Sequence, residues 1–371
     1  MSFRLGRIFG IPIRIHYTLW ILFLLIAWSL ATAYMPANYP GLGVATYWAI
    51  GVACAILLFV AVLVHELSHS IIAKRNGLPI SRITLFFFGG VSEISEEPRD
   101  PWLEVRMAAA GPFMSFLIAA VLGGLWILSR FYSAPMAIVA TLGYSAYLNA
   151  ILGGFNLIPA FPLDGGRVLR GTLWQRTRDL LKATAQATIV SKVISMLMII
   201  VGFLMIVFSD VINGLWIFFL GWFIRSGAEN SLRQTRLTEA LSGVSVGDIM
   251  TRDLLTVSPE MTIQQLITDY FLSRPHGGYP VVSSGNPVGV VTMSSVRSIP
   301  KEQREIATVK DAMVPYEKMV TVNPTISALD ALHLMAQRGV GRLLVTQGDN
   351  LVRVLTRGDL MKTIRNRREL A

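Results

Sequence analysis

The segment Ala61-Val62-Leu63-Val64-His65-Glu66-Leu67-Ser68-His69 closes an uncharged run that begins at Trp48. His65 and His69 are four residues apart, so on a helix both imidazoles project from one face. That geometry suits two ligands of a tetrahedral zinc ion, with Glu66 beside them as a general base. Ionisable groups at membrane depth are costly and usually functional. The alternative is a chance match of a short pattern, and the uncharged run argues against it.

Composition places the chain among membrane proteins. Of its 371 residues, 53% are hydrophobic and only 15% are charged, and the mean hydropathy is +0.54. That is too apolar for a water-soluble protein of this length. The net charge is +10, but the basic residues flank apolar runs as positive cytoplasmic loops do, so no nucleic-acid partner is expected. The single cysteine, Cys54, excludes an intrachain disulfide.

Six apolar segments are predicted to span a membrane. The first resembles a signal peptide, but its apolar part is longer than usual, so we expect an uncleaved anchor. Residues 3–16 are predicted to form a short strand or a membrane-surface segment, and residues 80–94 two short strands, because both are rich in β-branched and aromatic residues. The expected spans are residues 17–35, 44–74, 107–128, 136–158, 193–208 and 211–224.

The basic residues predict the orientation of these spans. With the N-terminus in the cytoplasm, the cytoplasmic flanks hold 17 lysines and arginines, and the opposite side holds Arg130 alone. Short cytoplasmic loops carry such an excess of positive charge. We therefore expect a multi-pass protein of a prokaryotic-type cell membrane, in contact with the lipid bilayer, with both termini in the cytoplasm.

The fourth span ends in Asn156-Leu157-Ile158-Pro159-Ala160-Phe161-Pro162-Leu163-Asp164-Gly165-Gly166. Two prolines break the helix, so this end must be irregular and internally satisfied. Asp164 lies at the mouth of the break. The predicted orientation puts it on the cytoplasmic side, together with the end of the second span that carries His65 and His69. Asp164 is therefore the natural candidate for a third metal ligand.

From about Leu237 the chain becomes polar and repeats itself. Asp248-Ile249-Met250 recurs as Asp311-Ala312-Met313, and Val257-Ser258-Pro259 recurs as Val322-Asn323-Pro324. The offset stays between 63 and 65 residues across the repeat. A duplicated unit of strand, helix, two strands and helix usually packs as one compact module.

The first 230 residues resemble the site-2 protease family of intramembrane zinc metalloproteases. The resemblance rests on His65-Glu66-Leu67-Ser68-His69 and on the segment from Asn156 to Gly166, which matches the family's NxxPxxPLDGG pattern. Together these two motifs are highly specific. The resemblance implies that both histidines of the first motif and Asp164 bind one zinc ion per chain.

The same resemblance implies further roles. Glu66 is then the catalytic base, and Asn156 steadies the substrate or the oxyanion. The Gly89-Gly90 pair resembles part of the family's membrane-associated sheet. The chain departs from the family pattern at Ser115, where an asparagine often follows the Gly-Pro of the third span. The departure bears on a supporting contact and not on the metal site itself.

A substrate helix hides its carbonyl groups, so it must unwind before it can be cleaved. The strand edge beside the metal motif is predicted to hold the unwound substrate by strand addition. The residues predicted to do so are Phe88, Gly89, Gly90 and Val91. The alternative is a hairpin that merely packs on the membrane domain.

The repeat resembles a tandem pair of CBS domains, named after cystathionine beta-synthase. Such pairs often bind adenine nucleotides through a Thr or Ser followed three residues later by an Asp. The second copy keeps Thr356 and Asp359, whereas the first has Thr292 and then Ser295. We therefore expect at most one well-formed nucleotide site. The alternative is a structural or dimerising module without a ligand. The CBS domains are also the expected contact of a homodimer.

The predicted architecture is a polytopic α-helical membrane domain (residues 1–230) of about six spans with a small membrane-associated β-sheet. A linker (231–240) and a soluble α/β tandem CBS pair (241–371, repeats about 241–300 and 305–365) follow. The predicted function is zinc-dependent hydrolysis of peptide bonds in or near transmembrane segments of membrane proteins, regulated by an adenine nucleotide. The rivals are a CBS-gated transporter or channel and a non-catalytic membrane scaffold, neither of which requires a metal motif paired with a distant aspartate.

Overall fold

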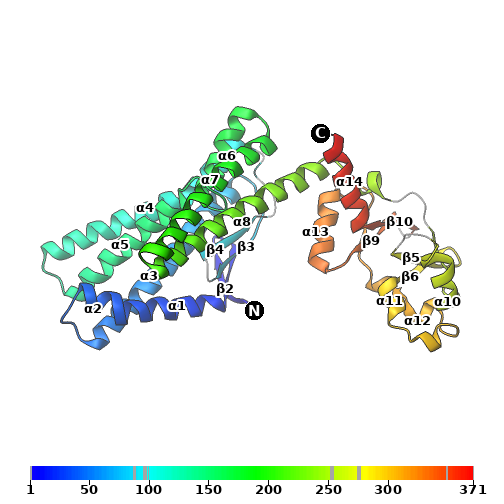
Figure 1. Cartoon of the computed structure of the whole chain (residues 1–371), viewed down its shortest axis with the longest axis horizontal. Helices are drawn as coiled ribbons and strands as arrows, with labels where there is room; N and C mark the ends of the chain where they lie inside the picture. The colour runs from blue at the N-terminus through cyan, green and yellow to red at the C-terminus, as the bar shows by residue number, and fades with distance from the viewer. Residues whose placement is uncertain are drawn as a thin grey trace. The chain divides into compact units, whose positions relative to one another are not determined.

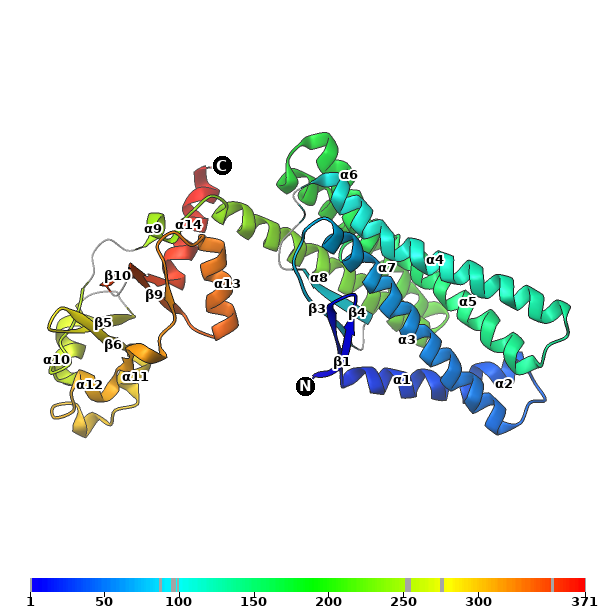
Figure 2. The same cartoon turned by 180° about the vertical axis from the view of Figure 1, so that it is seen from behind.

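A computed structural model describes residues 2–86, 89–94, 98, 100–250, 255–273, 277–347 and 350–370 (Figures 1 and 2). The chain forms two compact units, Met1–Thr235 and Arg236–Ala371. The boundary between them falls inside helix α8 (Val211–Leu241), so the residues expected to form a linker are helical.

Within the described residues, six helical segments are long and apolar enough to cross a membrane. The first, Thr18–Asn38, contains a π-helical turn between two α-helices. The segments are formed by α1 (Thr18–Ser29) with η1 (Leu30–Tyr34) and α2 (Met35–Asn38), α3 (Val44–Arg75), α4 (Pro101–Phe131), α5 (Met136–Asn156), α7 (Leu180–Phe208) and α8.

Large apolar side chains cover the outside of these helices. Phe131, Phe208 and Ile212 are 78%, 80% and 80% exposed. A soluble monomer rarely shows a wide apolar surface, whereas lipid hydrocarbon is a favourable solvent for it. The expected polytopic helical membrane domain is thereby confirmed.

Several spans are longer than the sequence predicted, and the two largest differences are in α7 and α8. Helix α7 begins at Leu180 instead of residue 193, because the carboxylate of Asp179 accepts a hydrogen bond of 2.8 Å from the backbone N–H of Lys182 and caps the helix. Helix α8 continues past residue 224, and an ion pair of 3.6 Å between Arg225 and Glu229, one turn apart, supports its polar part. Both predicted limits followed the apolar run, which is shorter than the helix.

The break after α5 is irregular, as predicted, and is followed by a helix that was not predicted. Helix α6 (Asp164–Thr177) begins at the aspartate itself. The turn before it is so close that a Cβ on Gly165 would lie 2.3 Å from the carbonyl oxygen of Leu157. Only glycine fits there, and this allows the chain to fold back and start α6 at Asp164.

Within its described residues, the first unit holds one four-stranded sheet in the order β1-β2-β3-β4. The strands are β1 (Ser2–Ile8), β2 (Ile11–His16), β3 (Ile80–Phe86) and β4 (Gly89–Ile94). The central pair β2 and β3 is parallel and the two outer pairs are antiparallel. Strands β3 and β4 lie against α3, so the sheet predicted beside the metal motif is present and β4 is one of its edges.

The second unit holds the repeat. Its strands form two sheets, β5-β6-β7 and β10-β9-β8, each with its own apolar core. Val246 packs in the core of the second repeat and Val309 in that of the first, so each repeat contributes its leading segment to the other. The strands are β5 (Gly278–Ser283), β6 (Asn286–Thr292), β7 (Val314–Pro315), β8 (Thr321–Val322), β9 (Arg342–Gln347) and β10 (Asn350–Thr356).

Short helices complete the two repeats, and two longer ones, α13 and α14, belong to the second. The order β8, α13, β9, β10, α14 matches the predicted strand, helix, two strands and helix. In the first repeat, the leading strand is reduced to a bridge between Val257 and Val281. The helices are α9 (Val246–Ile249), α10 (Ile263–Leu266), η2 (Ile267–Phe271), α11 (Met293–Arg297), η3 (Lys301–Gln303), α12 (Val309–Ala312), η4 (Tyr316–Lys318), α13 (Ala328–Arg338) and α14 (Arg357–Leu370).

Candidate metal centre

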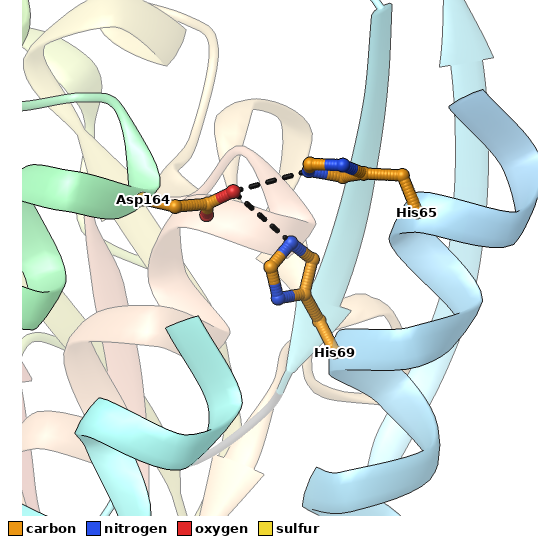
Figure 3. Close-up of side chains that lie close together, drawn as sticks. All are labelled: His65, His69 and Asp164. Atoms are coloured by element: carbon orange, nitrogen blue, oxygen red, sulfur yellow. Dashed lines mark hydrogen bonds and ion pairs between the residues drawn. The ribbon is translucent and has the colours of Figure 1, made fainter. Parts of the chain in front are cut away.

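The three predicted metal ligands converge on one point (Figure 3). His65 and His69 lie one turn apart on α3, and Asp164 is the first residue of α6. Oδ2 of Asp164 is 3.1 Å from Nε2 of His65 and 3.2 Å from Nε2 of His69. All three candidate ligand atoms lie within 4.8 Å of one another, and both histidines are buried. Residues 99 positions apart in sequence thus form one cluster.

Helix α4 fixes the orientation of both imidazoles. Nδ1 of His65 lies 2.9 Å from Oγ of Ser115, and Nδ1 of His69 lies 2.6 Å from the backbone carbonyl oxygen of Met107. A carbonyl can only accept, so Nδ1 of His69 must donate. Both Nε2 atoms are therefore directed at Asp164, as hydrogen-bonded histidine ligands direct a lone pair at a metal.

Gly111 leaves the space between the two imidazoles open. A Cβ at this position of α4 would lie 2.3 Å from Nε2 of His69 and 2.5 Å from Nε2 of His65. Any side chain at this position would therefore occupy the space between the two Nε2 atoms, where an ion bound to both must lie. The glycine at the start of Gly111-Pro112 keeps this space free, beyond its role in close helix packing.

The cluster fits a zinc ion. Ligands about 2.0 Å from a tetrahedral zinc lie roughly 3.3 Å from one another, close to the two distances measured here. Because Nδ1 of His69 donates to the carbonyl of Met107, Nε2 is the nitrogen left to bind an ion together with Oδ2 of Asp164, 3.2 Å away. Burial raises the pKa of Asp164, but the two imidazoles facing it lower that pKa by more, so the carboxylate is ionised at neutral pH.

Glu66 lies next to the cluster and is held by strand β4. Oγ of Ser92 is 2.9 Å from Oε2 of Glu66 and donates to it, and Oγ of Ser70 lies 3.1 Å from Oγ of Ser92. Gly90 of the same strand touches the Glu66 side chain, since a Cβ there would lie 2.3 Å from Cγ. Helix α3 and strand β4 together therefore place one carboxylate.

The structure also places the residues predicted to bind substrate or nucleotide. The amide of Asn156 donates a hydrogen bond of 2.9 Å to the carbonyl oxygen of Leu152 in its own helix. Gly89, Gly90 and Val91 lie in β4, and Phe88 lies outside the described residues. Oδ2 of Asp359 accepts hydrogen bonds from the backbone N–H and the hydroxyl of Thr356, at 2.9 and 2.7 Å.

Nothing in the sequence indicated the contact between Ser92 and Glu66. The two residues are 26 positions apart, and no spacing links a strand serine to a helix glutamate. Ser115 was noted only as a departure from an expected asparagine, yet its hydroxyl makes a contact with His65. A serine one helical turn from Gly111, on a face of small residues, is the signal that would have found it.

This geometry defines a class of protein, a metal-dependent hydrolase with its site among membrane-spanning helices. Comparison with known proteins is in agreement. The model of peptidase family M50 matches residues 53–140 and 131–201, and the CBS domain model matches residues 246–302 and 309–366. The chain belongs to the M50 family of zinc metalloproteases and carries a tandem pair of CBS domains.

Individual relatives cover almost the whole chain. A zinc metalloprotease of Methanocaldococcus jannaschii is 33% identical over 363 residues, which is 98% of this chain and 96% of the relative. Rip3 of Mycobacterium tuberculosis is 32% identical over 362 residues, or 97% of this chain and 92% of that protein. The solved site-2 protease from M. jannaschii is 35% identical, covers 63% of this chain and 96% of that chain, and superposes with a TM-score of 0.43.

Proposed function

We propose that this protein is a site-2-type intramembrane protease that hydrolyses peptide bonds in or near the transmembrane segments of membrane proteins. The observation that carries the proposal is the convergence of His65 and His69, in the last three turns of the membrane-spanning-length helix α3, with Asp164, the first residue of α6, beside Glu66. His65, His69 and Asp164 would hold a zinc ion, which would supply a Lewis acid for the scissile carbonyl and acidify water.

The acid–base work falls to Glu66. Its carboxylate accepts a proton from the attacking water and then donates that proton to the leaving amine of the cleaved peptide bond. Oε2 is occupied by the hydrogen bond from Ser92, which leaves Oε1 for the water. The amide of Asn156 is proposed to steady the substrate or its oxyanion, which requires it to exchange its bond to Leu152 for one to the substrate.

Strand β4 is proposed to hold the substrate. It is an edge of its sheet, and an edge strand can pair with an extended peptide through backbone hydrogen bonds. Gly90 touches Glu66, so a peptide bonded to this edge passes next to the proposed base. Substrate binding by Phe88, Gly89, Gly90 and Val91 follows from that placement as a proposal.

The orientation proposed from the basic flanks puts both termini and the metal centre on the cytoplasmic side of the membrane. Water for hydrolysis then enters from the cytoplasm. The CBS pair lies on that side as well and is proposed to bind an adenine nucleotide near Thr356 and Asp359 and to join two chains as a homodimer. Loss of nucleotide binding in Thr356→Ala, with binding retained in Thr292→Ala, tests the nucleotide site on the full-length protein.

Metal analysis of detergent-purified protein tests the proposed centre. The wild type is expected to hold about one zinc per chain, and His65→Ala and Asp164→Ala are expected to lose it or bind it much more weakly. His333→Ala is the matched control, because His333 lies in the CBS pair on α13. A wild type without zinc, after zinc has been added back, would favour a transporter or a scaffold.

A further inference from the structure

A buried ion pair lies outside the residues used so far. Glu104, in the first turn of α4, is 0% exposed, and Arg170, in α6, is 5% exposed. Both Nε and Nη2 of Arg170 donate to Oε1 of Glu104, with Nε at 2.7 Å. The guanidinium also lies over the ring of Phe161, 5.6 Å from its centroid. The roles proposed for the three metal ligands and for Glu66 do not explain why this ion pair is present.

A buried ion pair is weak evidence for a role in stability. Removing two charges from water offsets most of their attraction, and well-packed apolar residues often replace such a pair at no loss. This pair is also incompletely satisfied, because Oε2 of Glu104 is buried without a hydrogen-bond partner. Its presence is better explained by the geometry that it fixes, since two donors on one acceptor set both the distance and the direction of the arginine.

The pair joins the two parts of the metal centre. Helix α4 supplies the carbonyl of Met107 to His69, the hydroxyl of Ser115 to His65, and the open face of Gly111. Glu104 lies on the same helix, one turn before Met107. The positions of both histidine side chains therefore depend on the position of helix α4.

Helix α6 carries both the third ligand, Asp164, and Arg170, so the two residues move together with the helix. Asp164 is its first residue and Arg170 lies six positions further on. Gly171 packs so closely on α4 that a Cβ there would lie 2.7 Å from the Val105 side chain. The bond between Arg170 and Glu104 therefore fixes how far α6 can slide or turn along α4, and with it the place of Asp164.

We propose that Glu104 and Arg170 are positioning residues that hold Asp164 in register with the two histidines. The proposal rests on the metal centre described above. Outer contacts that orient metal ligands typically account for about 10- to 100-fold in metal affinity. Loss of the pair is expected to raise the zinc dissociation constant by at least about 10-fold, because α6 then samples positions in which Asp164 is out of reach.

The test is zinc affinity, measured by chelator competition on the full chain in detergent. Glu104→Met with Arg170→Met replaces both charges by apolar side chains of similar length, which should spare folding. Thermal unfolding in excess chelator measures folding without metal. The expected result is an unchanged unfolding midpoint together with a zinc dissociation constant raised at least about 10-fold. A constant within about twofold of the wild type would overturn the proposal.

Two further variants keep the test decisive. If the double variant does not fold, Glu104→Asp replaces it. This variant keeps the charge but moves the carboxylate away from Arg170 by one methylene. A zinc dissociation constant within about twofold of the wild type would again overturn the proposal. The control is Lys192→Met with Glu229→Met, which removes an ion pair of 3.3 Å between α7 and α8 that is nearly half exposed. It should leave zinc affinity unchanged. Full zinc binding by Asp164→Ala would overturn the metal centre itself.

Discussion

The hydroxyl of Ser92 donates a 2.9 Å hydrogen bond to Oε2 of Glu66, so a strand that is proposed to hold the substrate also holds the proposed catalytic base. A general base must reach its proton with correct geometry, and misplacement by about 1 Å can cost about 100-fold in rate. Ser92 therefore links the position of β4 to the rate of proton transfer.

Ser92→Ala is expected to lower kcat by about 10- to 100-fold, with KM and zinc content unchanged, because the carboxylate loses its fixed orientation. Ser92→Thr, which keeps the hydroxyl, should recover most of the rate. Ser68→Ala is the control, since Oγ of Ser68 donates to the carbonyl oxygen of Val64 within α3. Steady-state cleavage of a single-span substrate measures all three, and equal rates in Ser92→Ala and wild type would contradict the assigned role.

Gly111→Ala is expected to abolish zinc binding. The new methyl group would lie 2.3 and 2.5 Å from the two Nε2 atoms, inside the space that the ion needs. The loss of affinity should exceed the roughly 100-fold that the loss of an outer contact costs.

A matched control lies on the same helix. Gly123 and Gly124 of α4 have open space where a Cβ would be placed. Gly123→Ala should therefore keep one zinc per chain, measured by metal analysis after gel filtration. Normal zinc content in Gly111→Ala would show that the ion does not sit between the two histidines.

Ser115→Ala tests the contact that replaces the expected asparagine. Without Oγ, the imidazole of His65 loses the partner of Nδ1 and can rotate, so zinc affinity should fall by about 10- to 100-fold. Ser129→Ala, further along α4, removes a hydroxyl that bonds to the carbonyl of Trp126 and should have no effect. Chelator competition distinguishes the two, and equal affinities would remove Ser115 from the centre.

Stability of the CBS pair is expected to depend on pH through two capping aspartates. Hydrogen bonds from the hydroxyl and backbone of Ser245 lower the pKa of Asp248, and those from the backbone and hydroxyl of Thr308 lower the pKa of Asp311. A lowered pKa means that the folded state favours the ionised form. The contribution is therefore fully present above the ordinary aspartate pKa of about 3.9 and is lost as pH falls through the lower folded-state value.

The midpoint temperature of unfolding should therefore fall less between about pH 6 and pH 3 in the double variant Asp248→Asn with Asp311→Asn than in the wild type. All eight tryptophans lie in the first unit, so tryptophan fluorescence reports that unit alone and circular dichroism reports both. A second-unit transition with the same pH dependence in both proteins would contradict the assignment.

Much of the fold was predictable, because local pattern decides it. An uncharged run ending in a histidine pair indicates a span with a metal motif, and a constant offset of 63 to 65 residues indicates a duplicated module. Helix limits were less accurate. The start of α7, near Lys182, and the part of α8 that follows Arg225 are polar. Hydropathy therefore began the predicted span of α7 too late and ended that of α8 too early.

The site was predictable only where motifs carry it. The convergence of His65, His69 and Asp164 followed from orientation and from the family pattern. The contacts of Glu66 with Ser92 and of Glu104 with Arg170 depend on how a strand and a helix pack on α3 and α4, across 26 and 66 residues of sequence. Neither Glu104 nor Arg170 belongs to a motif, so nothing in the sequence singled them out.

Cleavage and metal content in Glu66→Gln, measured side by side in proteoliposomes containing a single-span substrate, test the proposed mechanism most directly. We expect about one zinc per chain, as in the wild type, and no cleavage above the level without enzyme, because the ligands are intact and the base is gone. Cleavage at the wild-type rate by Glu66→Gln would contradict the proposed mechanism.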